Sequence, residues 1–163
     1  SNSLVGEIPT SLFELKSLSA LDLSSNVLSS EIPREIGRLA SLRFLNISSN
    51  PFKGRIPTSL ALLKKLEVFN AINTHLDGTL PLELASLSRL RVFAMGSTHL
   101  SGSLSTELAN LQNLEIISLD GNCIIGTIPT EIAHLAFLDS FDLSRNFLEG
   151  SIPPELILAP NLI

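Results

Sequence analysis

Two histidines and the only cysteine of the chain recur at one fixed spacing, and they are the first residues whose chemistry needs an explanation. His75, His99 and Cys123 follow one another at intervals of 24 residues. Imidazole and thiolate groups are good zinc ligands. However, a straight column on a parallel sheet would leave the outer two about 10 Å apart, which does not suit tetrahedral coordination. No fourth ligand shares the spacing, so we expect exposed side chains and no metal site.

The other polar residues do not form a catalytic set. His134 lies away from any serine or cysteine nucleophile, the acidic residues are dispersed, and no phosphate-binding loop is present. Paired carboxylates act as acid and base inside a pocket, and a repeat fold filled with its own side chains offers none. We therefore expect neither enzymatic activity nor a cofactor.

The interval of 24 residues belongs to a pattern that is repeated seven times without an insertion. One phase of the pattern, the ladder position, is asparagine or threonine in every copy: Asn2, Asn26, Asn50, Thr74, Thr98, Asn122 and Asn146. Leucines or other apolar residues stand on both sides of it, followed by glycine and Ile-Pro. A fixed period in this range is the mark of a solenoid, in which each coil contacts only its neighbours.

One coil reads L-x-x-L-x-L-S-x-N-x-L-x-G-x-I-P-x-x-L-x-x-L-x-x, as in residues 42–65. This resembles the plant-type, extracellular class of leucine-rich repeat, found in receptor-like kinase and receptor-like protein ectodomains and in polygalacturonase-inhibiting proteins. Similar repeats occur in algae such as diatoms. The resemblance covers residues 1–163 as a single domain. It implies an α/β solenoid: a curved right-handed superhelix with a parallel β-sheet on the concave side and short 3-10 turns on the convex side.

The residues support each part of such a coil. The alternation Leu21-Asp22-Leu23 and its equivalents predict a short strand with the leucines inside. The Ile-Pro pair at 32/33 fixes an extended residue before a proline that opens a helical turn, so residues 33–36 predict a short convex helix. The ladder asparagines can both donate to and accept from buried backbone groups of the turn. Thr74 and Thr98 have one hydroxyl each and satisfy fewer partners, which predicts a looser turn there.

The outward residues of the strands form the candidate binding site. Phe44, Val68, Val92 and Ile116 predict an apolar stripe about 14 Å long across neighbouring strands. Polar and apolar residues flank it: Asn46, Asn70, Ile72 and Asp120. A contiguous exposed apolar patch with a polar rim is an interaction signal. The alternative is that these residue types simply favour strands, and a register slip of one residue would turn the stripe into the core.

Composition excludes several partners. The 11 basic and 16 acidic residues give a net charge of −5, and no basic stripe suits nucleic acid or an anionic membrane. No stretch approaches the roughly 18 apolar residues of a membrane span. Asn46-Ile47-Ser48 is an N-glycosylation sequon.

The repeat is already in phase at Asn2 and still in phase at Leu162. Terminal coils of solenoids need a polar outer face, and both ends here expose core positions. We expect an internal segment of a longer protein, with capping modules or subunits adjoining both ends and any membrane anchor outside it.

These features favour a recognition module at the cell surface or in the extracellular space, which binds a protein, peptide or glycan on its concave face. An extracellular enzyme inhibitor of the polygalacturonase-inhibiting type is an alternative, although it favours a more charged face than Ala94, Gly96 and Ser118 provide. A structural or ice-binding role is a third. Ice binding favours regular threonine columns, whereas the column that holds Glu31 and Arg55 is charged and irregular.

Overall fold

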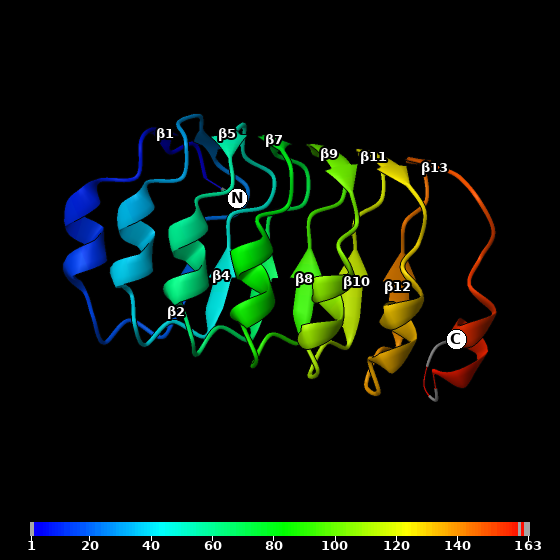
Figure 1. The fold of residues 1–163 in the computed structure, drawn as a ribbon. Helices are drawn as coiled ribbons and strands as arrows, with labels where there is room; N and C mark the ends of the chain where they lie inside the picture. Colours follow the sequence, from blue (N-terminus) through cyan, green and yellow to red (C-terminus); the bar gives the residue numbers. More distant parts are fainter. Residues whose placement is uncertain (1, 160, 162–163) are drawn as a thin grey trace.

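The computed structural model describes residues 2–159 and 161, and its coils stack in one row from the N-terminus to the C-terminus (Figure 1). Leu162, which continues the repeat in sequence, lies outside the described residues. Each coil contributes a strand to one face and a short helix to the opposite face, with a second set of strands along one edge (Figure 1). The predicted leucine-rich repeat solenoid is confirmed.

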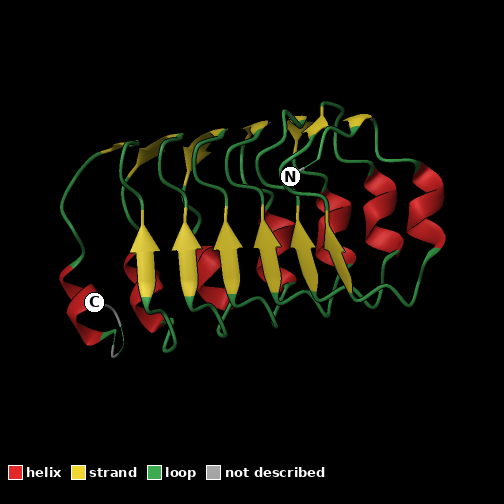
Figure 2. Ribbon diagram, turned by 180° about the vertical axis from the view of Figure 1, so that it is seen from behind, coloured by secondary structure: helices red, strands yellow, loops and turns green. Residues whose placement is uncertain are grey.

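The concave sheet contains six parallel strands in the described residues (Figure 2). They are β2 (Ala20–Asp22), β4 (Phe44–Asn46), β6 (Val68–Asn70), β8 (Val92–Ala94), β10 (Ile116–Ser118) and β12 (Ser140–Asp142). Neighbouring strands come from consecutive coils and pair residue for residue at the 24-residue spacing. The middle residues Leu45, Phe69, Phe93 and Ile117 are buried, and they form one continuous core with the convex leucines.

The strands begin one residue earlier than the predicted Leu21-Asp22-Leu23 alternation and end at its middle residue. Four of these six strands end in a local turn that the side chain of the last residue makes. The Oδ1 atom of Asp22 accepts a hydrogen bond from the backbone N–H of Ser24 at 2.9 Å. Asn46 and Asn70 cap their own strands in the same way. A side chain that binds the N–H two residues ahead favours a turn over further extension.

A second set of strands, the lateral sheet, is not among the sequence predictions. It consists of β1 (Val5–Gly6), β3 (Val27–Leu28), β5 (Lys53–Arg55), β7 (His75–Gly78), β9 (His99–Ser103), β11 (Cys123–Gly126) and β13 (Phe147–Leu148). β1 pairs with β3 alone, while β5 to β13 form a continuous five-stranded sheet. The lateral sheet is therefore interrupted between β3 and β5.

The convex side carries seven 3-10 helices within the described residues. They are η1 (Thr10–Glu14), η2 (Arg34–Arg38), η3 (Thr58–Leu62), η4 (Leu82–Ser86), η5 (Thr106–Asn110), η6 (Thr130–His134) and η7 (Pro154–Leu158). A proline precedes six of them, as the Ile-Pro signal predicts. Ser105 replaces it before η5, and its Oγ accepts a bond from the N–H of Glu107 at 3.1 Å. None of these helices is long and apolar enough to cross a bilayer.

The ladder side chains join neighbouring coils. The amide of Asn50 donates to the carbonyl oxygens of Leu23 at 2.9 Å and Ile47 at 3.1 Å, and its Oδ1 accepts from the N–H of Leu28. Thr74 instead donates once, to Ala71 in its own coil. The asparagines that link two coils are Asn26, Asn50, Asn122 and Asn146. Thr74 stabilises only its own turn.

Candidate ligand-binding face

The apolar stripe lies across the middle of the concave sheet. Phe44 pairs with Val68, Val68 with Val92, and Val92 with Ile116, so the four side chains occupy consecutive strands in direct register. All four are half-buried, whereas the next residue of each strand is buried. The strand register is therefore the predicted one, with the stripe facing outward. Part of each of these four side chains is therefore exposed on the concave face.

Two amides flank the stripe in β4 and β6. The Nδ2 atom of Asn46 lies 3.4 Å from a carboxylate oxygen of Asp22, and its Oδ1 accepts from the hydroxyl of Ser48 at 2.8 Å. The Oδ1 atom of Asn70 accepts from the N–H of Ile72 at 3.1 Å. These bonds hold both amides close to the sheet, with Ile72 half-buried beside them. The flank is therefore ordered by bonds within the protein.

Farther along the solenoid, the same flank differs from the outward column that the sequence suggests, since Ala94 pairs with Asn70 and Ser118 with Ala94. Ala94 is only 4% exposed, because its methyl group is too short to emerge between its neighbours. Gly96 has no side chain, and the carboxylate of Asp120 lies over it, where a Cβ atom would collide with Oδ1. The hydroxyl of Ser118 donates to that same Oδ1 at 2.9 Å. Asp120 thus presents an acidic group that Ser118 holds over Gly96, beyond the end of β10.

A row of alternating charges borders the strands just before they begin, and the sequence interpretation missed it. Arg43 forms an ion pair with Glu67, and Arg91 binds both carboxylate oxygens of Glu115 at 2.8 and 2.9 Å. The bond to Glu115 and its charge raise the pKa of Arg91. The signal was present in the sequence, because residues of opposite sign alternate at the 24-residue spacing.

The histidine and cysteine column belongs to the lateral sheet, away from the stripe. His75 and His99 begin β7 and β9, and their rings meet edge to face with centroids 5.7 Å apart. Cys123 begins β11 and is exposed. Across residues 2–159 and 161, no three histidine, cysteine, aspartate or glutamate side chains are grouped to hold a metal ion.

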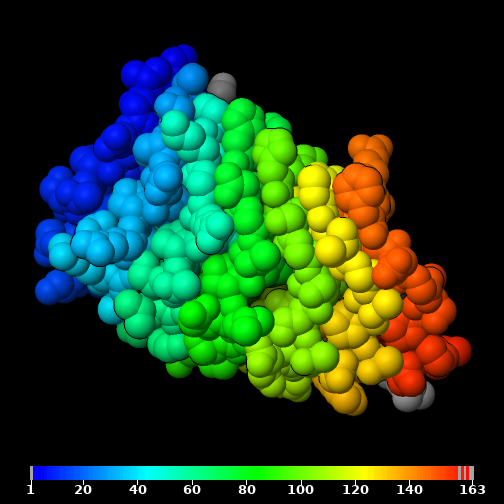
Figure 3. Space-filling model, turned by 45° about the horizontal axis from the view of Figure 1, so that its top comes forward, coloured from blue at the N-terminus to red at the C-terminus, as the bar shows by residue number. Residues whose placement is uncertain are grey.

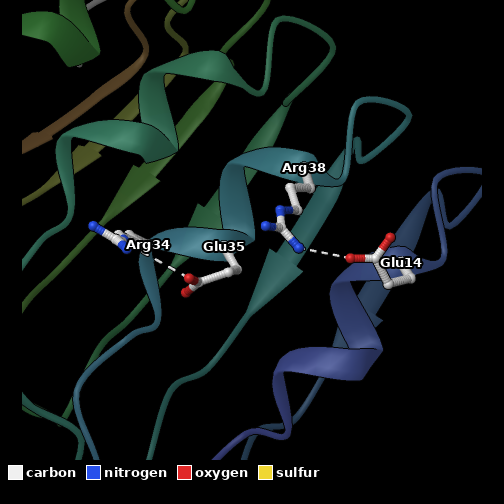
Figure 4. Close-up of polar contacts among 4 residues, drawn as sticks. All are labelled: Glu14, Arg34, Glu35 and Arg38. Atoms are coloured by element: carbon white, nitrogen blue, oxygen red, sulfur yellow. Dashed lines mark hydrogen bonds and ion pairs between the residues drawn. The ribbon is translucent and has the colours of Figure 1, made fainter.

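The convex helices carry exposed ion pairs. Arg38 of η2 binds Glu14 of η1 at 2.6 Å, and Arg34 lies 3.5 Å from Glu35 (Figure 4). A backbone hydrogen bond, reinforced by Arg34, lowers the pKa of Glu35. His134 lies at the end of η6, exposed on this side. Exposed pairs of this kind contribute little to stability.

Two protein families match the chain and identify the class of solenoid to which it belongs. A family described as leucine-rich repeat region matches residues 1–125. The Leucine Rich Repeat family matches residues 137–157. The chain belongs to the leucine-rich repeat family. No curated protein matches it.

Solved structures similar to this leucine-rich repeat chain are plant receptor ectodomains. The plant peptide hormone receptor RGFR1 in complex with RGF2 is 33% identical with a TM-score of 0.97, over 99% of this chain and 26% of that chain. The Arabidopsis receptor kinase HAESA, in complex with the peptide hormone IDA and the co-receptor SERK1, is 34% identical with a TM-score of 0.96, over 100% of this chain and 28% of that chain. The ectodomain of SOBIR1 from Arabidopsis thaliana is 37% identical with a TM-score of 0.76, over 80% and 72%. The chain thus spans about a quarter of the two hormone receptors.

Proposed function

We propose that this leucine-rich repeat chain is a non-catalytic recognition module that holds an extended peptide, or an extended segment of a protein, on its concave face. The observation that carries the proposal is the stripe of Phe44, Val68, Val92 and Ile116, which stands in direct register across four strands. An apolar centre within a polar rim is the usual anatomy of an interface. Central apolar and aromatic anchors tend to dominate the binding energy.

The rim suits a peptide for a physical reason. A peptide backbone that loses water needs hydrogen-bond partners. The amides of Asn46 and Asn70 lie beside the stripe, and the carboxylate of Asp120 lies over Gly96. All three groups are already ordered by bonds within the protein. An ordered site loses less conformational entropy on binding. The stripe would take the apolar side chains of the ligand, and the rim its polar groups.

The similar receptors support this choice of ligand and suggest where the protein works. RGFR1 and HAESA were solved with the peptide hormones RGF2 and IDA. By analogy, the proposed ligand is a peptide and the proposed location is the extracellular side of a cell. The chain spans about a quarter of each of these receptors, so the role of the whole protein is part of the same proposal.

Panning of a phage-displayed random peptide library on the immobilised chain tests the proposal. We expect selected peptides to bind Val92→Glu and Phe44→Glu variants about tenfold more weakly or worse, because a carboxylate in the stripe must be desolvated. His134→Gln on the convex side is the matched control and should bind normally. Equal binding to the parent and both stripe variants would refute the concave site.

The sequon at Asn46 offers an independent check on the same face. The side chain of Asn46 is half-buried beside Phe44 in β4, so an N-glycan there would cover part of the stripe. Protein secreted from a glycosylating host should bind the selected peptides less well before enzymatic deglycosylation than after it. Unchanged binding by protein that mass spectrometry shows to be glycosylated at Asn46 would place the ligand elsewhere.

A further inference from the structure

The interruption of the lateral sheet has an identifiable cause in the sequence. On either side of the break, an N–H donates to the carbonyl oxygen 23 residues earlier, as Val27 does to Leu4 and His75 to Phe52, both at 2.8 Å. The equivalent donor at the break is residue 51, which is proline and has no N–H. The carbonyl oxygen of Leu28 therefore lacks the backbone hydrogen bond that would join β3 to β5. The bond from Lys53 to Ser30, at 3.2 Å, still connects the two coils.

A hollow of about 1090 Å³ lies at this break. The buried residues Ile8, Ile32 and Ile56 line its inner wall, one from each of three coils. Charged residues surround it: Glu7, Glu31, Arg34, Lys53, Arg55 and Asp77. The hollow lies between the lateral strands and the beginnings of η1 and η2, on the edge that Figure 3 turns toward the viewer, in the blue and cyan coils. It is separate from the concave face.

Most of these charges form no ion pair with another described residue. Arg34 turns to Glu35 on η2 (Figure 4). Within the described part of the chain, no ion pair involves Glu7, Glu31, Lys53, Arg55 or Asp77. On the concave border, by contrast, arginine and glutamate residues of neighbouring coils do pair. The charges around the hollow are therefore free to meet charges on another molecule.

Two glycines leave room for the long side chains of Glu31 and Arg55 to lie against the surface. A Cβ atom on Gly54 would lie 2.9 Å from Cγ of Glu31, and a Cβ atom on Gly78 would lie 3.1 Å from Cγ of Arg55. Each charged chain therefore lies across the glycine of the next coil. Further along the same column the residues are short hydroxyl side chains: Thr79, Ser103, Thr127 and Ser151. The charges are thus concentrated at the hollow.

The order of the charges along the solenoid is specific. Glu7 and Glu31 come from the first two coils, Lys53 and Arg55 come from the third, and Asp77 of the fourth pairs in register with Arg55. Successive coils of a parallel sheet are about 5 Å apart. An extended peptide advances about 3.3 Å per residue and points every second side chain to the same side. Two side chains of the peptide that are two residues apart would therefore lie beside the acidic and the basic residues of the hollow, one beside each.

We propose that this hollow is a second binding site, for an extended segment of a partner protein that carries a basic residue and, two positions away, an acidic residue. The basic side chain lies beside Glu7 and Glu31, and the acidic one beside Lys53 and Arg55. The isoleucine wall faces the peptide backbone between them, because the intervening side chain points away from the hollow. This site is independent of the proposed concave site, and either one functions without the other.

Nuclear magnetic resonance titration of the isotope-labelled chain tests this site. The probe is an acetylated and amidated pentapeptide of glycine with lysine at its second position and aspartate at its fourth. Amide signals of Ser30, Lys53 and Arg55 should shift. Glu31→Gln and Arg55→Gln should each weaken binding about tenfold, as the loss of one charge-assisted hydrogen bond predicts. Raising the ionic strength from about 0.05 to about 0.5 M should also weaken it, because exposed charges are screened.

The matched control is Glu149→Gln, which removes an exposed acid beyond β13 on the same edge. It should leave the titration unchanged. Control peptides with two lysines or two aspartates should bind at least about tenfold more weakly, because each meets one repulsive pair. Equal affinity for all three peptides, or shifts confined to the concave strands, would overturn the proposal.

Discussion

The side-chain amide of Asn122 donates to the carbonyl oxygen of Met95 at 2.8 Å and thereby links two coils. The same amide also binds Leu119 in its own turn at 3.1 Å, and its Oδ1 accepts from the N–H of Leu100 at 2.9 Å. Asn122 is 4% exposed, so water does not readily replace these bonds. The solenoid is held together by such polar links as well as by its leucines.

Replacement of Asn122 by alanine should destabilise the chain by about 1–3 kcal/mol, the cost of leaving buried backbone groups without partners. Chemical denaturation followed by circular dichroism measures the change. An unfolding midpoint equal to that of the parent would show that the ladder bonds contribute nothing.

Thr74→Asn should stabilise the chain or leave its stability unchanged. Thr74 is buried and makes one bond, to Ala71 in its own coil. An asparagine there would add the links to the preceding coil that Asn50 and Asn122 make. The same denaturation measurement applies, and a loss of more than about 1 kcal/mol would mean that the site is too tightly packed for the larger side chain.

Asp142 should make the stability of the chain depend on pH. The backbone bond from Ser144, and then the bond from its side chain, lower the pKa of Asp142 below its ordinary value of 3.8. At a pH between the folded and the unfolded pKa of Asp142, the folded state therefore binds fewer protons than the unfolded state. The contribution of Asp142 to the stability of the fold is present above about pH 4 and is lost as the pH falls through the folded pKa. Asp142→Asn keeps an acceptor for the Ser144 N–H, as Asn46 does for Ser48. Thermal melts from pH 6 to pH 2 should show a smaller loss for the variant than for the parent, and identical losses would contradict the assignment.

Two glycines without positive φ should respond differently to alanine. A Cβ atom on Gly37 would lie 2.7 Å from the main-chain oxygen of Ser59, which the backbone of η3 fixes. Gly37→Ala should therefore cost about 1–3 kcal/mol, even though alanine occupies the same phase in later coils, at Ala61 and Ala85.

Gly96→Ala should leave the melting temperature nearly unchanged, because only the carboxylate end of Asp120 has to rotate away. Since Asp120 belongs to the proposed ligand face, peptide affinity should change while stability does not. Differential scanning calorimetry separates the two variants. A large loss of stability in Gly96→Ala, or no loss in Gly37→Ala, would contradict the assignment of rigid and movable neighbours at these two glycines.

A sequence predicts the interactions that restrict which residue types can occupy a position, and it does not predict the others. The alternation around Leu45 and the proline before six of the seven described helices predicted the concave strands and the convex helices, because burial and backbone restriction select residues directly. The lateral sheet was missed because its strands pair through backbone atoms that any residue carries. Ala94 was expected on the surface, yet its burial depends on the size of its neighbours. The placement of Asp120 over Gly96 depends on a rotamer, which the spacing of residues does not encode.

Neighbouring residues of β8 provide the sharpest test of the concave face. Phe93 is 2% exposed and its ring centroid lies 6.1 Å from that of Phe69, so it belongs to the core. Val92 is half-buried on the opposite side of the strand. Phe93→Glu should cost more than about 3 kcal/mol and unfold its coil, because the large side chain is lost and a carboxylate is buried. Val92→Glu should cost less than about 1 kcal/mol, because the new carboxylate reaches solvent. Hydrogen exchange at the amides of β6, β8 and β10 measures both effects, and equal loss of protection in the two variants would refute the outward position of the stripe.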